Sequence, residues 1–305
     1  MSNIIFRMPS EFTISTARFF LKEVEDVFKW NNLEKKNFQL EMVSTEKIDL
    51  FGQLLLYKFL EYTVKHHCFY FPKINVNNKI TEELKKSTFW SLINDFIRNK
   101  EVNYRELKFR EFSGLFIVPI NLTTKTKDEA EALYAPRITS YYHDRHVQFV
   151  VLSCMGEVAS NFHEHSSDKT NAILVASGNE SNFKIACADT GIGIISSLRP
   201  ALGRDYQRKE KFEVLQKSVE KEVTSKLNTN HTGCGLWLID SFVTGLKGDL
   251  HIYTEGAYYI NHQGKIKRGV CSYWKGTIIY VNIPFNNKQA LVDMRKLMEE
   301  GLVEI

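Results

Sequence analysis

The amino-acid sequence predicts an α/β protein, specifically an α+β two-layer sandwich in which helices cover a sheet, divided into two domains. Its 305 residues, 43% hydrophobic and 25% charged, suffice for one large or two ordinary soluble domains. Stretches with strand-like and helix-like periods alternate along the chain, as expected when helices pack on a sheet. We place the domains at residues 1–105 and 106–285, followed by a C-terminal helix at 286–305.

The first domain is expected to be a small α/β unit. Its strands are predicted where the sequence alternates or turns β-like, at 3–8, 38–44 and 68–74. Its helices are predicted where apolar residues recur at helical spacing, at 12–28, 47–67 and 81–100.

The second domain opens with a β-like run at 112–120 and a polar stretch, "NLTTKTKDEAEA", which is either a linker or the start of a helix. Helices are predicted at 145–165 and 233–248, and strands at 171–177, 182–189 and 276–285, with turns at Gly256 and 262–264. The long polar stretch at 195–232 is expected to be a functional lid or a disordered excursion.

Composition excludes several function classes. The formal charge of +4 is too small and too dispersed to predict nucleic-acid or membrane binding. The five cysteines show no CxxC pair and no zinc spacing, which favours reduced, packed thiols. We find neither a signal-peptide pattern nor an apolar run of about 18 residues, so we expect a cytoplasmic protein.

The predicted helix at 145–165 carries a first candidate site. Glu157, Asn161 and His165 are four residues apart, so they share one helix face. The alternative is an ordinary solvent-facing stripe, because Ser153, Glu157, Ser160 and Glu164 also follow helical spacing.

Two glycine-rich turns follow. "ACADTGIGI" places Asp189 at the end of a strand and then Gly191 and Gly193, where a ligand can approach the backbone, although a simple turn has the same pattern. "HTGCGLWLI" places Gly233 and Gly235 just before a helix, whose free amides attract phosphate. A plain glycine-rich helix entry is the alternative.

Taken in this order, with a polar lid between the second and third, the three boxes resemble the GHKL (Bergerat-fold) ATP-binding superfamily, which includes DNA gyrase, histidine kinases, MutL and anti-sigma serine kinases. The match covers roughly residues 140–285. The family's E-x-x-x-N box matches "EVASN". It implies Glu157 as the general base and Asn161 as a Mg²⁺ ligand, with His165 one turn further on. No role in the family falls on His163.

The resemblance also implies the rest of the site. Asp189 would accept a hydrogen bond from the adenine amine, with Gly191 and Gly193 shaping the base pocket and Thr277 in "KGTIIYVNIPF" supporting the contact. The backbone amides of Gly233, Cys234, Gly235 and Leu236 would cradle the phosphates. Trp237 stands where a further glycine is common in the family. Any of the lid cations, such as Arg204, Lys209 or Lys226, could reach a phosphate.

The first domain more weakly resembles a STAS domain. Where antagonists of that family have an Asp-Ser-Ser-Gly turn with a phosphorylated serine, this chain has Asp49, Leu50, Phe51 and Gly52. Because the acceptor hydroxyl is missing, the resemblance implies that the domain docks a partner or the ATPase domain. His66 and His67 lack the context of a histidine-kinase phosphoacceptor.

Three functions remain open. The first is an ATPase that hydrolyses Mg·ATP or uses it to control a protein partner, which could be a second copy of the chain. The second is a protein kinase of the anti-sigma serine kinase type. The third is a nucleotide-sensing interaction module with little turnover.

Overall fold

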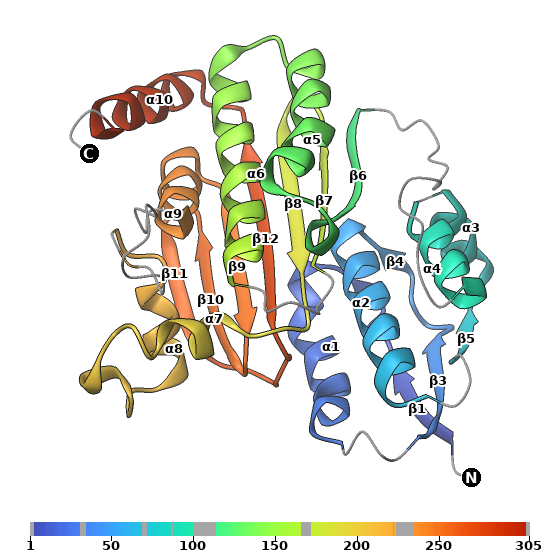
Figure 1. The fold of residues 1–305 in the computed structure, drawn as a ribbon. Coiled ribbons are helices and arrows are strands. Elements are labelled where there is room, and N and C mark those ends of the chain that lie inside the picture. Colours follow the sequence, from blue (N-terminus) through green and yellow to red (C-terminus); the bar gives the residue numbers. More distant parts are fainter. Residues whose placement is uncertain are drawn as a thin grey trace. The chain divides into compact units, whose positions relative to one another are not determined.

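The computed structural model describes residues 3–30, 35–68, 72–86, 88–99, 114–165, 172–221, 223 and 235–302. The chain has a mixed α/β fold and divides into two compact units (Figure 1). Unit 1 comprises Met1–Glu111 and Cys271–Lys275, and unit 2 comprises Phe112–Val270 and Gly276–Ile305. The first unit ends at Glu111 rather than at residue 105, and the division differs from the predicted one in two further ways. A short segment late in the chain belongs to unit 1, and the C-terminal helix belongs to unit 2.

Unit 1 contains a three-stranded parallel sheet in the order β1-β3-β5 and a two-stranded parallel pair, β2-β4. Its strands are β1 (Asn3–Arg7), β2 (Glu11–Phe12), β3 (Asn37–Met42), β4 (Lys47–Ile48) and β5 (Lys73–Val76). Its helices are η1 (Ile14–Thr16), α1 (Ala17–Val24), η2 (Glu25–Lys29), α2 (Leu50–His66), α3 (Asn78–Lys86) and α4 (Thr88–Asn99). The predicted helix at 12–28 is therefore split into three pieces, and the one at 81–100 into two helices.

Helix α2 begins in the turn Asp49–Gly52, the counterpart of the STAS phosphoacceptor turn. The Asp49 carboxylate caps the helix by accepting a hydrogen bond from the Gly52 amide at 2.9 Å. A β-carbon at Gly52 would collide with the backbone carbonyl of Phe12. Asp49 and Gly52 are thus explained by helix capping and close packing.

Unit 2 is built on a seven-stranded antiparallel sheet in the order β11-β10-β9-β12-β8-β7-β6. Its strands are β6 (Leu115–Asn121), β7 (Ile173–Gly178), β8 (Asn182–Ala188), β9 (Asp249–Thr254), β10 (Ala257–His262), β11 (Lys265–Val270) and β12 (Thr277–Pro284). Its helices are η3 (Leu122–Thr124), α5 (Lys127–Tyr141), α6 (Arg145–His165), α7 (Ile194–Leu198), η4 (Arg204–Tyr206), α8 (Lys211–Lys217), α9 (Gly235–Leu246) and α10 (Lys288–Leu302).

The core of unit 2 lies between this sheet and a layer of helices. Helices α5, α6 and α9 lie over one face of the sheet (Figure 1). Alternate residues of a strand face the same side, so Leu250 and Ile252 of β9 and Ile279 of β12 enter the same core as Val158 of α6 and Phe242 of α9. This packing fixes the two helices that carry the first and third sequence boxes.

The polar segments contain regular structure. Thr126 and Glu129 form a capping box, and α5 starts at Lys127, so "NLTTKTKDEAEA" is the start of a helix rather than a linker. The segment expected to be a lid holds α7, η4 and α8 in its described part, 195–221. Residues 222 and 224–232 lie outside the described residues.

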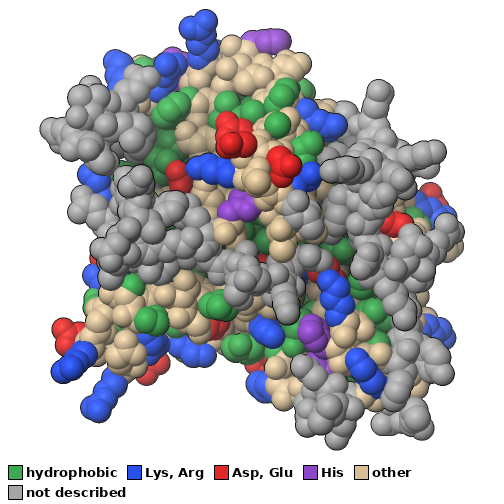
Figure 2. All heavy atoms as spheres, in the orientation of Figure 1, with side chains coloured by type: hydrophobic (Ala, Val, Ile, Leu, Met, Phe, Trp, Pro, Cys, Tyr) green, Lys and Arg blue, Asp and Glu red, His purple; other side chains and the backbone are tan. Residues whose placement is uncertain are grey.

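The expectations on membrane helices, cysteines and charge can be compared with the structure. Among the residues described, no helix has the length and apolarity required to cross a membrane. The described cysteines are free thiols, and Cys68, Cys154 and Cys187 are buried. On the face drawn in Figure 2, Lys and Arg side chains are scattered rather than gathered in one patch.

Candidate functional site

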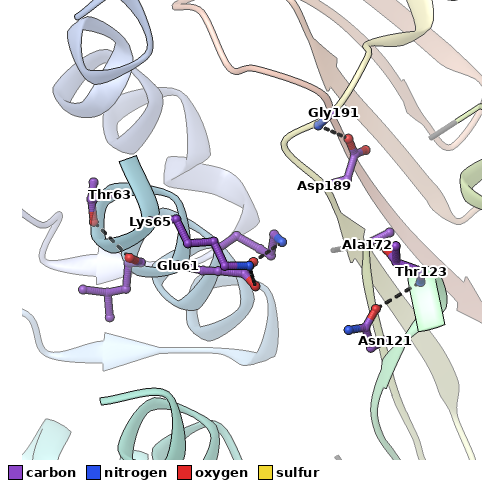
Figure 3. Close-up of polar contacts among 10 residues, drawn as sticks. Glu61, Thr63, Lys65, Asn121, Thr123, Ala172, Asp189 and Gly191 are labelled. Atoms are coloured by element: carbon purple, nitrogen blue, oxygen red, sulfur yellow. Dashed lines mark hydrogen bonds and ion pairs between the residues drawn. The ribbon is translucent and has the colours of Figure 1, made fainter. Parts of the chain in front are cut away.

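Asp189 follows the last residue of β8 and is 2% exposed. Its Oδ1 accepts a hydrogen bond from the Gly191 amide at 2.5 Å (Figure 3), and its Oδ2 accepts one from the Thr277 amide at 3.2 Å. The Asp189 amide in turn donates to the Thr277 carbonyl at 3.0 Å. A carboxylate oxygen is an acceptor, so the two backbone amides hold the Asp189 side chain in a defined orientation.

Gly276 completes the wall around Asp189, and sequence reasoning did not name it. Its φ of +90° favours glycine, and a β-carbon there would stand 2.5 Å from Asp189 Oδ1 and 2.7 Å from the Gly191 amide nitrogen. Its position in the sequence could have identified it, because Gly276 directly precedes the predicted site residue Thr277.

Helices α6 and α9 meet at the first and third boxes. Glu157 and Asn161 lie one turn apart on α6, and the Asn161 side-chain amide donates to the Glu157 carbonyl at 2.8 Å. Gly235 is the first residue of α9, and a β-carbon there would stand 2.6 Å from Glu157 Oε2 and 3.3 Å from Asn161 Nδ2. Glycine at 235 therefore lets the start of α9 reach both side chains.

A small pocket joins the first and second boxes. It is lined by Asn161, Phe162, Asp189, Ile192, Ile194, Thr277 and Ile279. Apolar side chains thus surround one buried carboxylate and one amide. Mainly apolar walls with a few polar groups are typical of small-molecule sites.

Gly193 takes part in a different contact from the one expected. A β-carbon at Gly193 would collide with the side chain of Glu255, which lies in the turn between β9 and β10. The Glu255 carboxylate accepts hydrogen bonds from the amide, at 2.9 Å, and the hydroxyl of Ser196 in α7. Gly193 therefore makes room for a protein carboxylate at the start of α7.

The remaining predicted residues are placed as follows. Thr277 is 4% exposed, and its hydroxyl lies 3.4 Å from that of Thr254. Leu236 packs its side chain into the core at the start of α9. His165 is the last residue of α6, but its side chain is outside the description. Gly233, Cys234 and Lys226 lie outside the described residues.

One described lid cation, Lys221, contacts a side chain at the start of α9. Its ammonium is 5.5 Å from the ring centre of Trp237, the third residue of α9. Lys209 instead pairs with Glu213 at 3.6 Å. Sequence reasoning named Arg204, Lys209 and Lys226 but missed Lys221, because a contact with a residue sixteen positions away leaves no local pattern.

Two ionisable groups close to Glu157, the Tyr134 hydroxyl and the Cys154 thiol, are kept neutral by their surroundings. Burial raises the pKa of Tyr134, and the carboxylates of Glu131 and Glu157 raise it further. Burial likewise raises the pKa of Cys154, three residues before Glu157. No group of three or more His, Cys, Asp and Glu side chains suited to a metal occurs in the described part of the chain.

No protein-family model matches the chain, and no curated protein matches it in sequence.

Proposed function

We propose that unit 2 is a GHKL-type domain that binds Mg·ATP in the pocket beside Asp189 and hydrolyses it. One observation carries the proposal: segments far apart in sequence meet around a single site. Asn161 and Asp189 line the same pocket, and Gly235 abuts Glu157 and Asn161. These are the segments through which the sequence resembles the family.

The base end of the site would be the Asp189 pocket. Phe162, Ile192 and Ile279 supply apolar walls suited to a flat aromatic ring. A buried carboxylate, held by the amides of Gly191 and Thr277, suits an exocyclic amine because an amine is a hydrogen-bond donor. The residues therefore fit a purine that carries an amino group.

The phosphate end would lie between α6 and the start of α9. The first four amides of a helix have no intrahelical partner, and they attract anions together with the helix dipole. Asn161 donates its amide nitrogen to the Glu157 carbonyl, so its amide oxygen is directed away from that bond and suits a hard cation. When bound, Mg²⁺ would offset charge on the phosphate oxygens.

Glu157 would act as the general base of hydrolysis. Its carboxylate oxygen lies against Gly235, and hence beside the amides expected to hold the phosphates. From there it would orient a water molecule towards the terminal phosphate and accept its proton.

Unit 1 would serve as a STAS-like module that docks a partner. Its parallel β1-β3-β5 sheet and the buried helix α2 support this assignment, and Asp49 and Gly52 have structural roles that require no phosphorylated residue.

Calorimetry and product analysis test the function. We expect the wild type to bind ATP in a Mg²⁺-dependent manner and Asp189→Asn to lose most of that affinity, because the new amide would direct donors at backbone donors. Glu157→Gln should bind ATP but lose hydrolysis by about a hundredfold or more. The exposed Glu131→Gln on α5 is the matched control.

Labelled γ-phosphate separates the three functions that the site could serve. Release of inorganic phosphate supports the ATPase. Transfer of the label to a protein would identify a kinase, and tight binding without turnover would identify a nucleotide sensor. Hydrolysis that survives Glu157→Gln would remove this residue from the catalytic role.

A further inference from the structure

The segment Cys271–Lys275 leaves unit 2 between β11 and β12, which are consecutive in the chain, and belongs to unit 1. Its Trp274 is 0% exposed. The Trp274 ring packs on Phe28 at 5.1 Å and on Phe20 at 6.4 Å between ring centres. A tryptophan from the second half of the chain is thus part of the aromatic core of the first unit.

Two further contacts hold this segment in unit 1. The Tyr273 amide donates a hydrogen bond to Glu25 Oε2 at 3.2 Å. The Lys275 ammonium lies 5.7 Å from the ring centre of Tyr62 on α2. The segment is therefore anchored by its backbone as well as by its side chains.

The next residues of the chain form the wall of the Asp189 pocket. Gly276 lies against Asp189 with no room for a β-carbon, and the Thr277 amide donates to Asp189 Oδ2 at 3.2 Å. Three residues span at most about 11 Å, so no flexible linker separates Trp274 from Thr277. A change at either end must be absorbed within Lys275 and Gly276.

We propose that Trp274 is a positioning residue for the Asp189 pocket: its anchorage in unit 1 holds the Gly276–Thr277 peptide against Asp189, so that unit 1 regulates nucleotide affinity. The inference rests on the proposed function. Because binding free energies are linked reciprocally, a nucleotide in the pocket must then stabilise the anchorage of the segment by the same factor.

Affinity for a Mg²⁺-bound, non-hydrolysable ATP analogue, measured by calorimetry, tests the proposal. Trp274→Ala should weaken binding about fivefold or more, which is the lower end of typical coupling. Trp274→Phe keeps an aromatic ring in the core and should restore most of the affinity. Phe89→Ala, a comparable deletion in the core of unit 1 outside the segment, should leave affinity unchanged.

If Trp274→Ala does not fold, a pair of variants that leave the core intact tests the same proposal. Glu25→Gln weakens the bond to the Tyr273 amide without opening a cavity, and it should lower affinity measurably. Asp26→Asn is the matched control, because its side chain is 73% exposed and pairs with Lys29. Hydrogen exchange provides the reciprocal readout: the analogue should slow exchange of the Tyr273 amide in the wild type.

The outcomes separate this inference from the function on which it rests. Wild-type affinity in Trp274→Ala or Glu25→Gln, together with unchanged exchange at Tyr273, would overturn the positioning role and leave the nucleotide site standing. A wild type that does not bind the analogue would overturn the function, and the inference with it.

Discussion

Gly235 lies so close to Glu157 that a β-carbon at position 235 would stand 2.6 Å from Glu157 Oε2. Helix α9 therefore starts directly beside a carboxylate on α6, across 78 residues of sequence. Gly235→Ala should displace the carboxylate and reduce hydrolysis roughly tenfold or more while affecting ATP affinity less, because small misplacements at a reacting centre are costly. Steady-state kinetics with separate kcat and KM would measure this.

Gly156→Ala is the matched control for that variant. A β-carbon at Gly156 meets only the Tyr134 hydroxyl, at an ordinary 3.8 Å. Alanine in a helix interior should stabilise the protein by about 0.5–1 kcal/mol and leave turnover unchanged. Equal turnover in Gly235→Ala and Gly156→Ala would mean that the contact with Glu157 does not matter for the reaction.

Gly276→Ala should be strongly destabilising, by about 2 kcal/mol or more in urea unfolding, and should also weaken nucleotide binding. The substitution strains a backbone with φ of +90° and collides with the backbone of Asp189. Gly264→Ala is the comparison, since its φ is +85° but its β-carbon would meet only Thr244 at 3.5 Å. Equal losses of stability in the two variants would assign the whole effect to φ.

Lys221→Ala should weaken ATP binding about two- to fivefold, the range expected for an exposed charge, and leave adenosine binding unchanged. Its ammonium lies over Trp237 near the start of α9. Lys209→Ala removes a cation that already pairs with Glu213, so it serves as the control. If adenosine and ATP lost affinity equally, Lys221 would not act on phosphate.

Stability should fall as the pH drops from about 6.5 towards 4. Burial lowers the pKa of His251 to about 4, a shift that His262 favours and Asp249 opposes. The unfolded chain therefore takes up the proton first, and the free energy of unfolding decreases by up to about 1.4 kcal/mol per pH unit in this window. Above pH 6.5 this contribution is fully present.

His251→Gln should reduce that slope in urea unfolding, whereas the exposed His143→Gln should keep it. Part of the slope should remain, because burial also lowers the pKa of His67, in unit 1, to about 4. A slope identical to that of the wild type in His251→Gln would contradict the assignment.

Local patterns predicted the elements of the candidate site well. The range of α6, Arg145–His165, agrees with the helical spacing in the sequence, and β7 and β8 follow from their alternating and β-branched residues. The capping box of Thr126 and Glu129 was also readable, and it identifies the start of α5. Each of these patterns lies in the helix or strand that it identifies, or within a few residues of it.

Contacts between distant segments could not be predicted in the same way. Gly193 fits a ligand turn in sequence, yet the side chain that fills its space is Glu255, sixty-two residues later. Trp274 is apolar in a short loop, and nothing local indicates that it enters the core of the first unit. Tertiary packing decides both positions.

Titration of ATP into the purified chain, with and without Mg²⁺, tests the central claim most directly. We predict saturable one-to-one binding that Mg²⁺ strengthens and that loses most of its affinity in Asp189→Asn. A wild type that releases no heat on addition of ATP, and whose amide hydrogen exchange ATP does not slow at any magnesium concentration, would contradict the claim that the Asp189 pocket is a nucleotide site.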